Sequence, residues 1–225
     1  MKLQEVLTPS FKALREQLGT KKEQKPLIQV SADSDFCRDV VAHGCLTEEQ
    51  MAHAAERYRL GKSKSGRCIF WMIDESGSIR DGHIGDSWAS VMLKAREPRL
   101  LCDYYPIHCF FGQHLLDSPL YPVCIIEKES SAVILSEVFT DCIWLATVYP
   151  TNFNVFSFEC LQGYDVTLFP PTDETMTTYT AWCELAEQAR QMYQRIGSIE
   201  VKDVLELNAT PEQKAARIDL LDFIF

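Results

Sequence analysis

The sequence lacks the features of membrane and secreted proteins. Its 225 residues contain no apolar run near the roughly 18 residues that a membrane-spanning helix needs. The first residues, MKLQEVLTPSFKALREQLG, alternate charged and apolar side chains and have no continuous apolar stretch like that of a secretory signal. We therefore expect a cytoplasmic protein with no membrane partner.

Closely spaced cysteine pairs are also missing. Nine cysteines are present, but no two of them form a Cys-x-x-Cys pair. Several lie in apolar, strand-like contexts, as Cys124 and Cys142 do, so we interpret most of them as small buried side chains in a reducing compartment. A zinc site built from Cys37, His43 and Cys45 is the alternative, although this spacing matches no common ligand pattern.

Positive charge is scarce, because 22 basic residues stand against 32 acidic ones and the net charge is −10. Non-specific binding to nucleic acid depends on neutralising phosphates, so this balance is unfavourable for it. Residues 57–67 are a local exception. This segment is either a candidate nucleic-acid-binding loop or a solvated loop that leads into a hairpin. Its basic residues are Arg57, Arg59, Lys62, Lys64 and Arg67.

What is present is the composition of an ordinary globular protein, with 46% hydrophobic and 24% charged residues. Residues 3–18 carry an apolar stripe at helical spacing, and a lysine-rich linker follows at 19–26. A second helical unit covers about 31–59, where Thr47 and Gln50 have the spacing of a capping box. We assign residues 1–60 to a helical N-terminal section.

Residues 61–105 are predicted to form a β-hairpin region. The stretch 67–73 is rich in β-forming residues, 74–77 has turn chemistry, and 78–84 can return as the partner strand. We expect 87–94 to be a short helix or a connection.

From residue 106 to 225 the pattern alternates between strands and helices. Three short apolar runs predict buried strands at 122–126, 142–146 and 165–169. Helical patterns separate or follow these strands, at 128–139, 153–161 and 175–195. A short strand or turn follows within 199–207, and Thr210 with Pro211 opens a last helix. The expected fold class is α/β: a parallel sheet flanked by helices, with a helical N-terminal section and a β-hairpin insertion.

Ligands of an open parallel sheet bind beyond the carboxyl ends of its strands. Glu127 and Lys128 follow the first predicted strand, and Asp173 follows the third. If these strands are neighbours, Glu127 and Asp173 share one rim and could hold Mg²⁺. The alternative is that these acidic residues only cap the helices that follow them.

Several segments resemble a known family. The run PVCIIEKESSAVILSEVFTDCIWLAT is similar to the first Toprim motif of primase-like proteins from bacterial mobile elements. The segments AAERYRLGKSKSGRCIFWMID, HCFFGQHLL and YDVTLFPPTDE resemble the same family in the same order, and the tail ATPEQKAARIDLLDFIF is compatible with it. The resemblance covers most of residues 45–225 and implies a Toprim-like fold.

The resemblance also implies roles for individual residues. Glu127 matches the Toprim glutamate, which acts as general acid or base or helps to hold metal, with Lys128 on the same rim. Asp173 matches the second aspartate of the Asp-x-Asp metal motif, whose first position holds Pro171 here. The glycines expected after the second strand fall at Val148 and Tyr149. These departures argue against nucleotidyl transfer.

Three functions are therefore open. The first is a catalytically degenerate Toprim-like protein of mobile-element DNA replication or processing. It would bind DNA or a replication partner, with at most a weakly held Mg²⁺ at Glu127 and Asp173. The second is a protein-interaction module that does not bind nucleic acid, which the net charge favours. The third is an active Mg²⁺-dependent nucleotidyl transferase or nuclease, in which another acidic residue replaces the missing aspartate.

Overall fold

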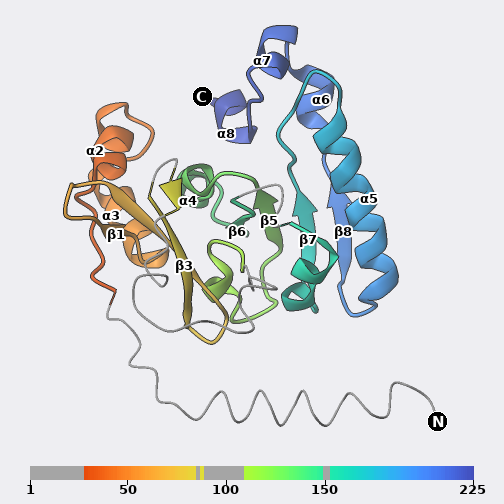
Figure 1. Cartoon of the computed structure of the whole chain (residues 1–225), viewed down its shortest axis with the longest axis horizontal. Coiled ribbons are helices and arrows are strands. Elements are labelled where there is room, and N and C mark those ends of the chain that lie inside the picture. The colour runs from red at the N-terminus through yellow and green to blue at the C-terminus, as the bar shows by residue number, and fades with distance from the viewer. Residues whose placement is uncertain (1–27, 85–86, 89–108, 149–152) are drawn as a thin grey trace.

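A computed structural model describes residues 28–84, 87–88, 109–148 and 153–225 (Figure 1). The helix predicted at 3–18 and the linker predicted at 19–26 lie outside the described residues. The chain has the predicted α/β fold, with a parallel sheet flanked by helices and a hairpin before it. Among the described residues, no helix is long and apolar enough to cross a membrane.

The parallel sheet has four strands in the order β6-β5-β7-β8. The three predicted buried strands are confirmed as β5 (Val123–Ile126), β6 (Ile143–Ala146) and β7 (Asp165–Leu168). The fourth is β8 (Ser198–Val201), where the sequence left a strand and a turn open. All neighbouring pairs are parallel, so the carboxyl ends of the strands lie at one edge.

Side chains of β5 alternate between two cores because successive residues of a strand point to opposite faces. Cys124 and Ile126 pack on the face covered by α4 (Glu129–Val138) and the N-terminal helices. Val123 and Ile125 pack on the other face, which η3 (Val155–Leu161) and α5 (Thr177–Met192) cover. Burial on both faces explains why this strand is apolar throughout.

The N-terminal section contains two helices, α2 (Asp35–Ala42) and α3 (Glu48–Arg57). The predicted capping box at the start of α3 is confirmed, because the Gln50 amide donates to Thr47 Oγ1 at 3.2 Å and the Thr47 amide donates to Gln50 Oε1 at 3.0 Å. Buried side chains of these helices share one core with the hairpin and with α4. The predicted boundary after residue 60 is therefore a change in the sequence pattern only. The described residues before and after it pack into one hydrophobic core.

The predicted hairpin is confirmed as β2 (Cys68–Ile73) and β3 (Ile79–Ile84). Together with β1 (Gly61–Lys62) and β4 (Ser87–Trp88) they form an antiparallel sheet in the order β1-β2-β3-β4. The prediction of a helix or connection at 87–94 is wrong for its first two residues, which pair with β3. Pairing with β3 decides their conformation; the rest of that prediction lies outside the described residues.

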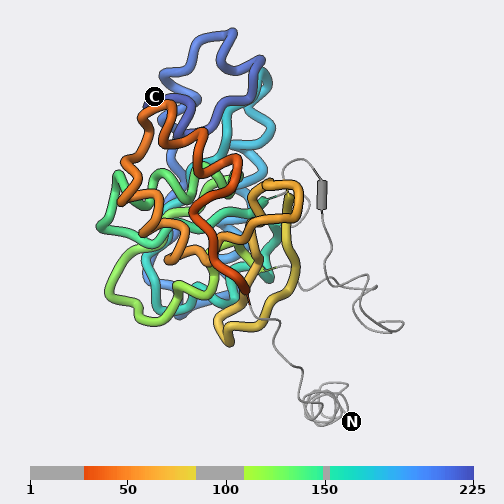
Figure 2. The backbone as a smooth tube through the Cα atoms, turned by 90° about the vertical axis from the view of Figure 1, so that its left-hand side faces the viewer, coloured from red at the N-terminus to blue at the C-terminus, as the bar shows by residue number. Residues whose placement is uncertain are grey.

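The last part of the chain forms α6 (Val204–Asn208), α7 (Pro211–Ala215) and α8 (Leu220–Ile224). Thr210 caps α7 and Pro211 is its first residue, as predicted. Both views place these helices at the end of the molecule toward which the parallel strands point (Figures 1 and 2). They therefore lie at the edge of the sheet where the sequence predicts the site.

Tyr58 connects the end of α3 to the parallel sheet. Its side chain is fully buried, stacks on Phe111 with ring centroids 5.1 Å apart, and donates a hydrogen bond to the Trp144 carbonyl of β6 at 2.9 Å. A buried carbonyl that loses its donor costs about 1–3 kcal/mol.

We predict that Tyr58→Phe lowers the free energy of unfolding by about 1–3 kcal/mol, because the phenyl ring keeps the packing and only the hydroxyl is lost. Urea denaturation followed by circular dichroism measures the change. Tyr121→Phe is the matched control, since that side chain is 55% exposed and its substitution should be neutral. Equal stability of the two variants would contradict the role given to the Tyr58 hydroxyl.

Candidate functional site

The predicted rim exists at the carboxyl end of the parallel sheet. Glu127 directly follows β5, and Asp173 lies beyond the end of the neighbouring strand β7. The condition for a shared rim, that the two strands are neighbours, is met because β5 and β7 pair in parallel. Each carboxylate nevertheless has its own partners.

Glu127 pairs with the C-terminal segment. Its Oε2 atom lies 3.5 Å from Nη2 of Arg217, and the side chain is only 18% exposed. Burial raises the pKa of Glu127, while the nearby cations Arg217 and Lys128 act in the opposite direction and do not cancel the effect of burial. This carboxylate is therefore held in a partly desolvated place beside a guanidinium group.

Lys128 makes a second contact with the same segment. Its ammonium group donates to Asp222 Oδ2 at 2.8 Å and lies 3.7 Å from Asp219 Oδ2. Burial lowers the pKa of Lys128, but the hydrogen bond to Asp222 and the charge of Asp219 outweigh it, so that the net shift is upward. Asp219 is fully buried and also accepts a hydrogen bond from Ser131 Oγ at 2.6 Å. The C-terminal segment is thus bound to the rim by charge pairs.

Asp173 is occupied by its own turn. Its carboxylate accepts hydrogen bonds from the backbone amides of Thr175, Thr177 and Thr178 and from the Thr175 hydroxyl. Burial raises the pKa of this carboxyl, but the hydrogen bonds from Thr178 and its neighbours outweigh that effect and hold the pKa far below its usual range. Asp173 therefore anchors the start of α5, as the capping alternative predicted.

The residues of the rim do not fit a Mg²⁺ site. Glu127 is paired with Arg217, Asp173 accepts four hydrogen bonds, and Pro171 contributes no side-chain ligand. In the part of the chain that the structure describes, no three His, Cys, Asp or Glu side chains are grouped so that they could hold a metal ion. Mg²⁺ needs several oxygen ligands around one position. The same finding leaves the zinc alternative at Cys37, His43 and Cys45 without support.

A cleft of about 610 Å³ lies beside this rim. It is lined by the start of α2, the hairpin, the first turn of α4 and Val148, the second residue after β6. Lys128, at the strand end, and Arg67, from the predicted basic loop, both line it. The complete lining consists of Asp35, Phe36, Asp39, Arg67, Cys68, Phe70, His83, Lys128, Glu129, Ser130 and Val148.

The predicted basic segment divides between different surroundings. Arg67 lines the cleft, and Lys64 is exposed in the loop that precedes it. Lys62 forms an ion pair with Asp33. Arg57 ends α3 and Arg59 follows it, and neither lines the cleft. The sequence therefore identified one arginine of the cleft together with four basic residues that the fold does not gather there.

His83 and Glu129 connect the hairpin to α4. Their side chains are hydrogen-bonded through His83 Nδ1 and are 13% and 9% exposed. This pair forms one wall of the cleft and determines how closely β3 approaches the first turn of α4. Sequence reasoning missed it, because the two residues are 46 positions apart and neither belongs to a recognisable motif.

Val148 has a strained backbone at the cleft. Its φ angle is +69°, in the left-handed region that β-branched residues rarely adopt. Its amide donates to the Glu127 carbonyl at 2.9 Å, so the conformation joins the ends of β5 and β6. The resemblance to Toprim proteins expects a glycine at this position. The backbone has the conformation that glycine favours, although the residue is valine.

We predict that Val148→Gly costs at least about 1 kcal/mol less than Val166→Gly, because only the first substitution releases left-handed strain. Both valines are buried, at 8% and 1% exposure, so the loss of packing is comparable. Urea denaturation of both variants measures the difference. If Val148→Gly is as destabilising as Val166→Gly, the strain is not significant.

Glu127 and Asp173 should respond to substitution in opposite directions. Above the ordinary carboxyl pKa of 3.8, the lowered pKa of Asp173 contributes stability, which is lost as the pH falls through the folded-state value. We predict that Asp173→Ala lowers the free energy of unfolding at pH 7 by about 1 kcal/mol, as the loss of a helix cap does, and that the deficit shrinks in acid.

For Glu127 the dependence of stability on pH has the opposite sign. A raised carboxyl pKa contributes stability below the ordinary value of 4.5, and this contribution is lost as the pH rises through the folded-state value. Glu127→Gln is therefore expected to leave the stability at pH 7 unchanged or increased, and the gain over the native protein should grow with pH. Denaturant titrations from about pH 2 to about pH 8, with pH values about one unit apart, measure both trends. A loss of stability in Glu127→Gln at pH 7 would show that the Arg217 pair outweighs burial.

A smaller cavity of about 440 Å³ lies near the hairpin turn. Buried Asp74 forms an ion pair with Arg80 there, and the Gln113 amide donates to Glu75. The contact between Gln113 and Glu75 ties the turn of the hairpin to the segment before β5.

Comparison with known proteins matches one family, and the matched region includes the residues of the cleft. A model of the DUF6371 family, described as a domain of unknown function, matches residues 35–172, which is more than half of the chain. All the residues that line the cleft fall within the match, and Asp173 lies just outside it. No curated protein and no solved structure matches the chain. The chain belongs to the DUF6371 family.

Proposed function

We propose that this protein is a catalytically degenerate Toprim-like domain that binds DNA in the replication or processing of mobile elements. The observation that carries the proposal is the meeting of Arg67 and Lys128 in one cleft at the carboxyl end of the parallel sheet. A cleft at this edge is where open α/β sheets bind their ligands. The resemblance to primase-like Toprim proteins supplies the biological setting.

The cleft has the chemistry to contact a phosphate backbone. Arg67 and Lys128 provide two positive charges, and the first turn of α4 provides backbone amides. Lys128, at the N-cap of α4, makes no side-chain hydrogen bond to those amides. A helix N-terminus with basic side chains beside it attracts anions.

The state of the rim supports the part of the proposal that concerns loss of catalysis. Nucleotidyl transfer in Toprim proteins needs carboxylates that are free to hold metal. Here the two predicted carboxylates are paired or hydrogen-bonded within the chain. Arg217 brings a positive charge to Glu127, one of the two carboxylates that were predicted to hold a divalent cation. We therefore propose that binding to DNA takes place without Mg²⁺.

A second candidate is a module that binds a partner protein, such as a replication protein. The specific observation in its favour is the presence of Asp35 and Asp39 in the same cleft, in a chain with a net charge of −10. Acidic groups repel phosphate and favour a basic peptide. Binding to DNA at low salt separates the two candidates.

We predict that the full chain binds mixed-sequence single-stranded or double-stranded oligonucleotides at low salt. Arg67→Ala and Lys128→Gln should each weaken binding and each reduce the slope of log affinity against log salt by about 1, because each removes one phosphate contact. Fluorescence anisotropy over a salt series measures this, with EDTA or with Mg²⁺ present. The affinity for DNA is expected to be the same with EDTA as with Mg²⁺.

Arg195→Ala is the matched control. It removes an exposed positive charge near the start of β7, where the Arg195 carbonyl accepts a hydrogen bond from the Gly163 amide. This variant should bind DNA as the native protein does. No binding at low salt would overturn the DNA proposal and favour the partner-protein candidate. Equal effects of all three substitutions would show that only net charge matters.

A further inference from the structure

Lys128 belongs both to the cleft and to the contact with the C-terminal helix α8. Its side chain is 44% exposed and lines the 610 Å³ cleft, where the proposed function requires it to meet a phosphate. The same ammonium group donates to Asp222 Oδ2 at 2.8 Å. Asp222 lies in α8, beyond the residues that match the family model. A phosphate that enters the cleft therefore meets a cation that already holds a carboxylate.

Other contacts fix the place of Asp222 in the fold. Asp219, at the N-cap of α8, is fully buried and accepts a hydrogen bond from Ser131 Oγ at 2.6 Å. The backbone amides of Leu221 and Asp222 donate to the same carboxylate. The neighbouring Leu220 is 8% exposed and packs in the core that contains α4. Because these contacts do not involve the Asp222 carboxylate, they keep it near Lys128 whichever anion the ammonium group holds.

The ion pair itself is exchangeable. The Asp222 side chain is 43% exposed, and ion pairs at half-exposed positions are weak because water competes for both partners. A phosphate oxygen accepts the same charge-assisted hydrogen bond as a carboxylate oxygen. Two anions beside one ammonium group also repel each other. The Asp222 carboxylate and a phosphate are therefore rivals for Lys128.

We propose that Asp222 is an internal competitor for the phosphate site at Lys128, so that the native chain binds DNA more weakly than it would with Lys128 unpaired. The inference rests on the proposed function and deepens it, because it names a residue outside the cleft that sets the affinity of that site. DNA is held at Lys128 when its phosphate takes the ammonium group from Asp222, while α8 stays in place.

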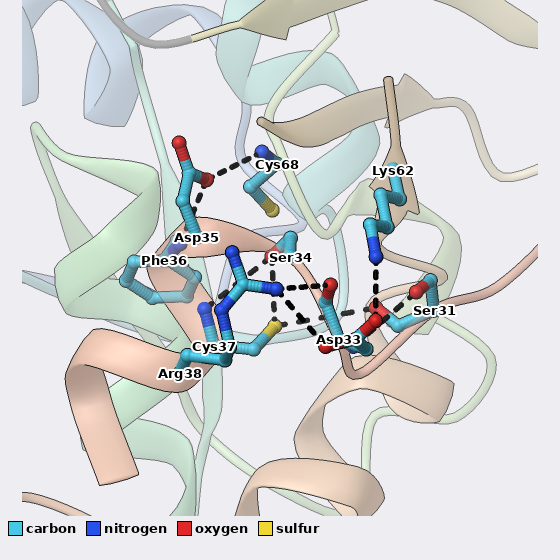
Figure 3. A network of polar contacts seen from close by, with 9 residues as sticks. All are labelled: Ser31, Asp33, Ser34, Asp35, Phe36, Cys37, Arg38, Lys62 and Cys68. Carbon is cyan, nitrogen blue, oxygen red and sulfur yellow. Dashed lines mark hydrogen bonds and ion pairs between the residues drawn. The ribbon is translucent and has the colours of Figure 1, made fainter. Parts of the chain in front are cut away.

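A comparable ion pair lies elsewhere on the surface. Lys62 is paired with Asp33, which also accepts a hydrogen bond from Arg38 (Figure 3). Asp33 is 71% exposed, and neither it nor Lys62 lines the cleft. The pair has the chemistry of the Lys128 pair in a different position, so Asp33→Asn is the matched control. It removes one acidic charge and releases a lysine that does not line the cleft.

The test is a double-mutant cycle on the full chain, measured by fluorescence anisotropy of a labelled mixed-sequence oligonucleotide at low salt. Asp222→Asn removes the charge and keeps an oxygen that can accept the Asp219 amide, as the native side chain does. We expect it to tighten binding about two- to fivefold, which corresponds to the loss of one surface ion pair. In a Lys128→Gln background, the same substitution should change the affinity no more than Asp33→Asn does in the native chain, because no ammonium group remains to be released.

A second readout follows the ion pair without DNA. The hydrogen bond to Asp222 is one cause of the raised pKa of Lys128. Asp222→Asn should therefore lower that pKa and increase the rate at which acetic anhydride acetylates Lys128, since the neutral amine is the reactive form. Peptide mapping by mass spectrometry measures the rate at this residue. Asp33→Asn should leave it unchanged.

The outcomes separate the competition from the proposed function. If the native protein binds DNA and Asp222→Asn binds no more tightly than Asp33→Asn, the competition is wrong and the proposed function stands. An equal gain from Asp222→Asn with and without Lys128 would also overturn the competition, since the carboxylate would then act through net charge. If no variant binds DNA while acetylation of Lys128 increases in Asp222→Asn, the ion pair is real, but the proposed function fails and the competition fails with it.

Discussion

The burial of β5 on both faces is the constraint on which the rest of the structure depends. Its four residues pack alternately into two cores, one with the N-terminal helices and α4 and the other with η3 and α5. A strand in this position must be apolar and must have parallel neighbours on both sides. Its carboxyl end then emerges at one edge of the sheet, so that Glu127 and Lys128 are the first polar residues beyond the core.

The charges at this edge are balanced within the chain. Arg217, Asp219 and Asp222 come from the C-terminal segment and pair with Glu127 and Lys128. A desolvated charge needs a partner, and a partner from the same chain saves the site from requiring an ion. The consequence is a rim with the electrostatics of an internal salt-bridge network. Arg67, which is not part of this network, lies on the cleft side of the rim, near the start of α4.

The cleft itself depends on the hairpin. Contact between His83 and Glu129 brings β3 against α4, and contact between Asp35 and the start of β2 brings α2 to the same place. Arg67 and Cys68 of the hairpin region then line the cleft together with Asp35 and Asp39 of α2. The candidate phosphate contacts therefore depend on the packing of α2 and the hairpin against the parallel sheet.

Local and periodic features were readable from the sequence. The three buried strands, the hairpin, the capping box at Thr47 and the cap at Thr210 depend on neighbouring residues, so residue type and spacing predict them. The adjacency of β5 and β7, which places Glu127 and Asp173 at one edge, was only a condition in the sequence analysis, and the strand order β6-β5-β7-β8 supplies it. The fourth strand β8 was ambiguous, because only its pairing with β7 distinguishes it from a turn.

What the sequence determined by itself is therefore the α/β fold class, the order of its elements and the residues at each strand end. Tertiary structure decided which charges meet. Arg217 reaches Glu127 across 90 residues, Asp173 turns back to its own helix, and His83 reaches Glu129. No local spacing encodes such contacts, because they arise only when separately folded elements pack. The physical reason is that burial selects partners in three dimensions, whereas a sequence pattern indicates only which residues of each element are buried.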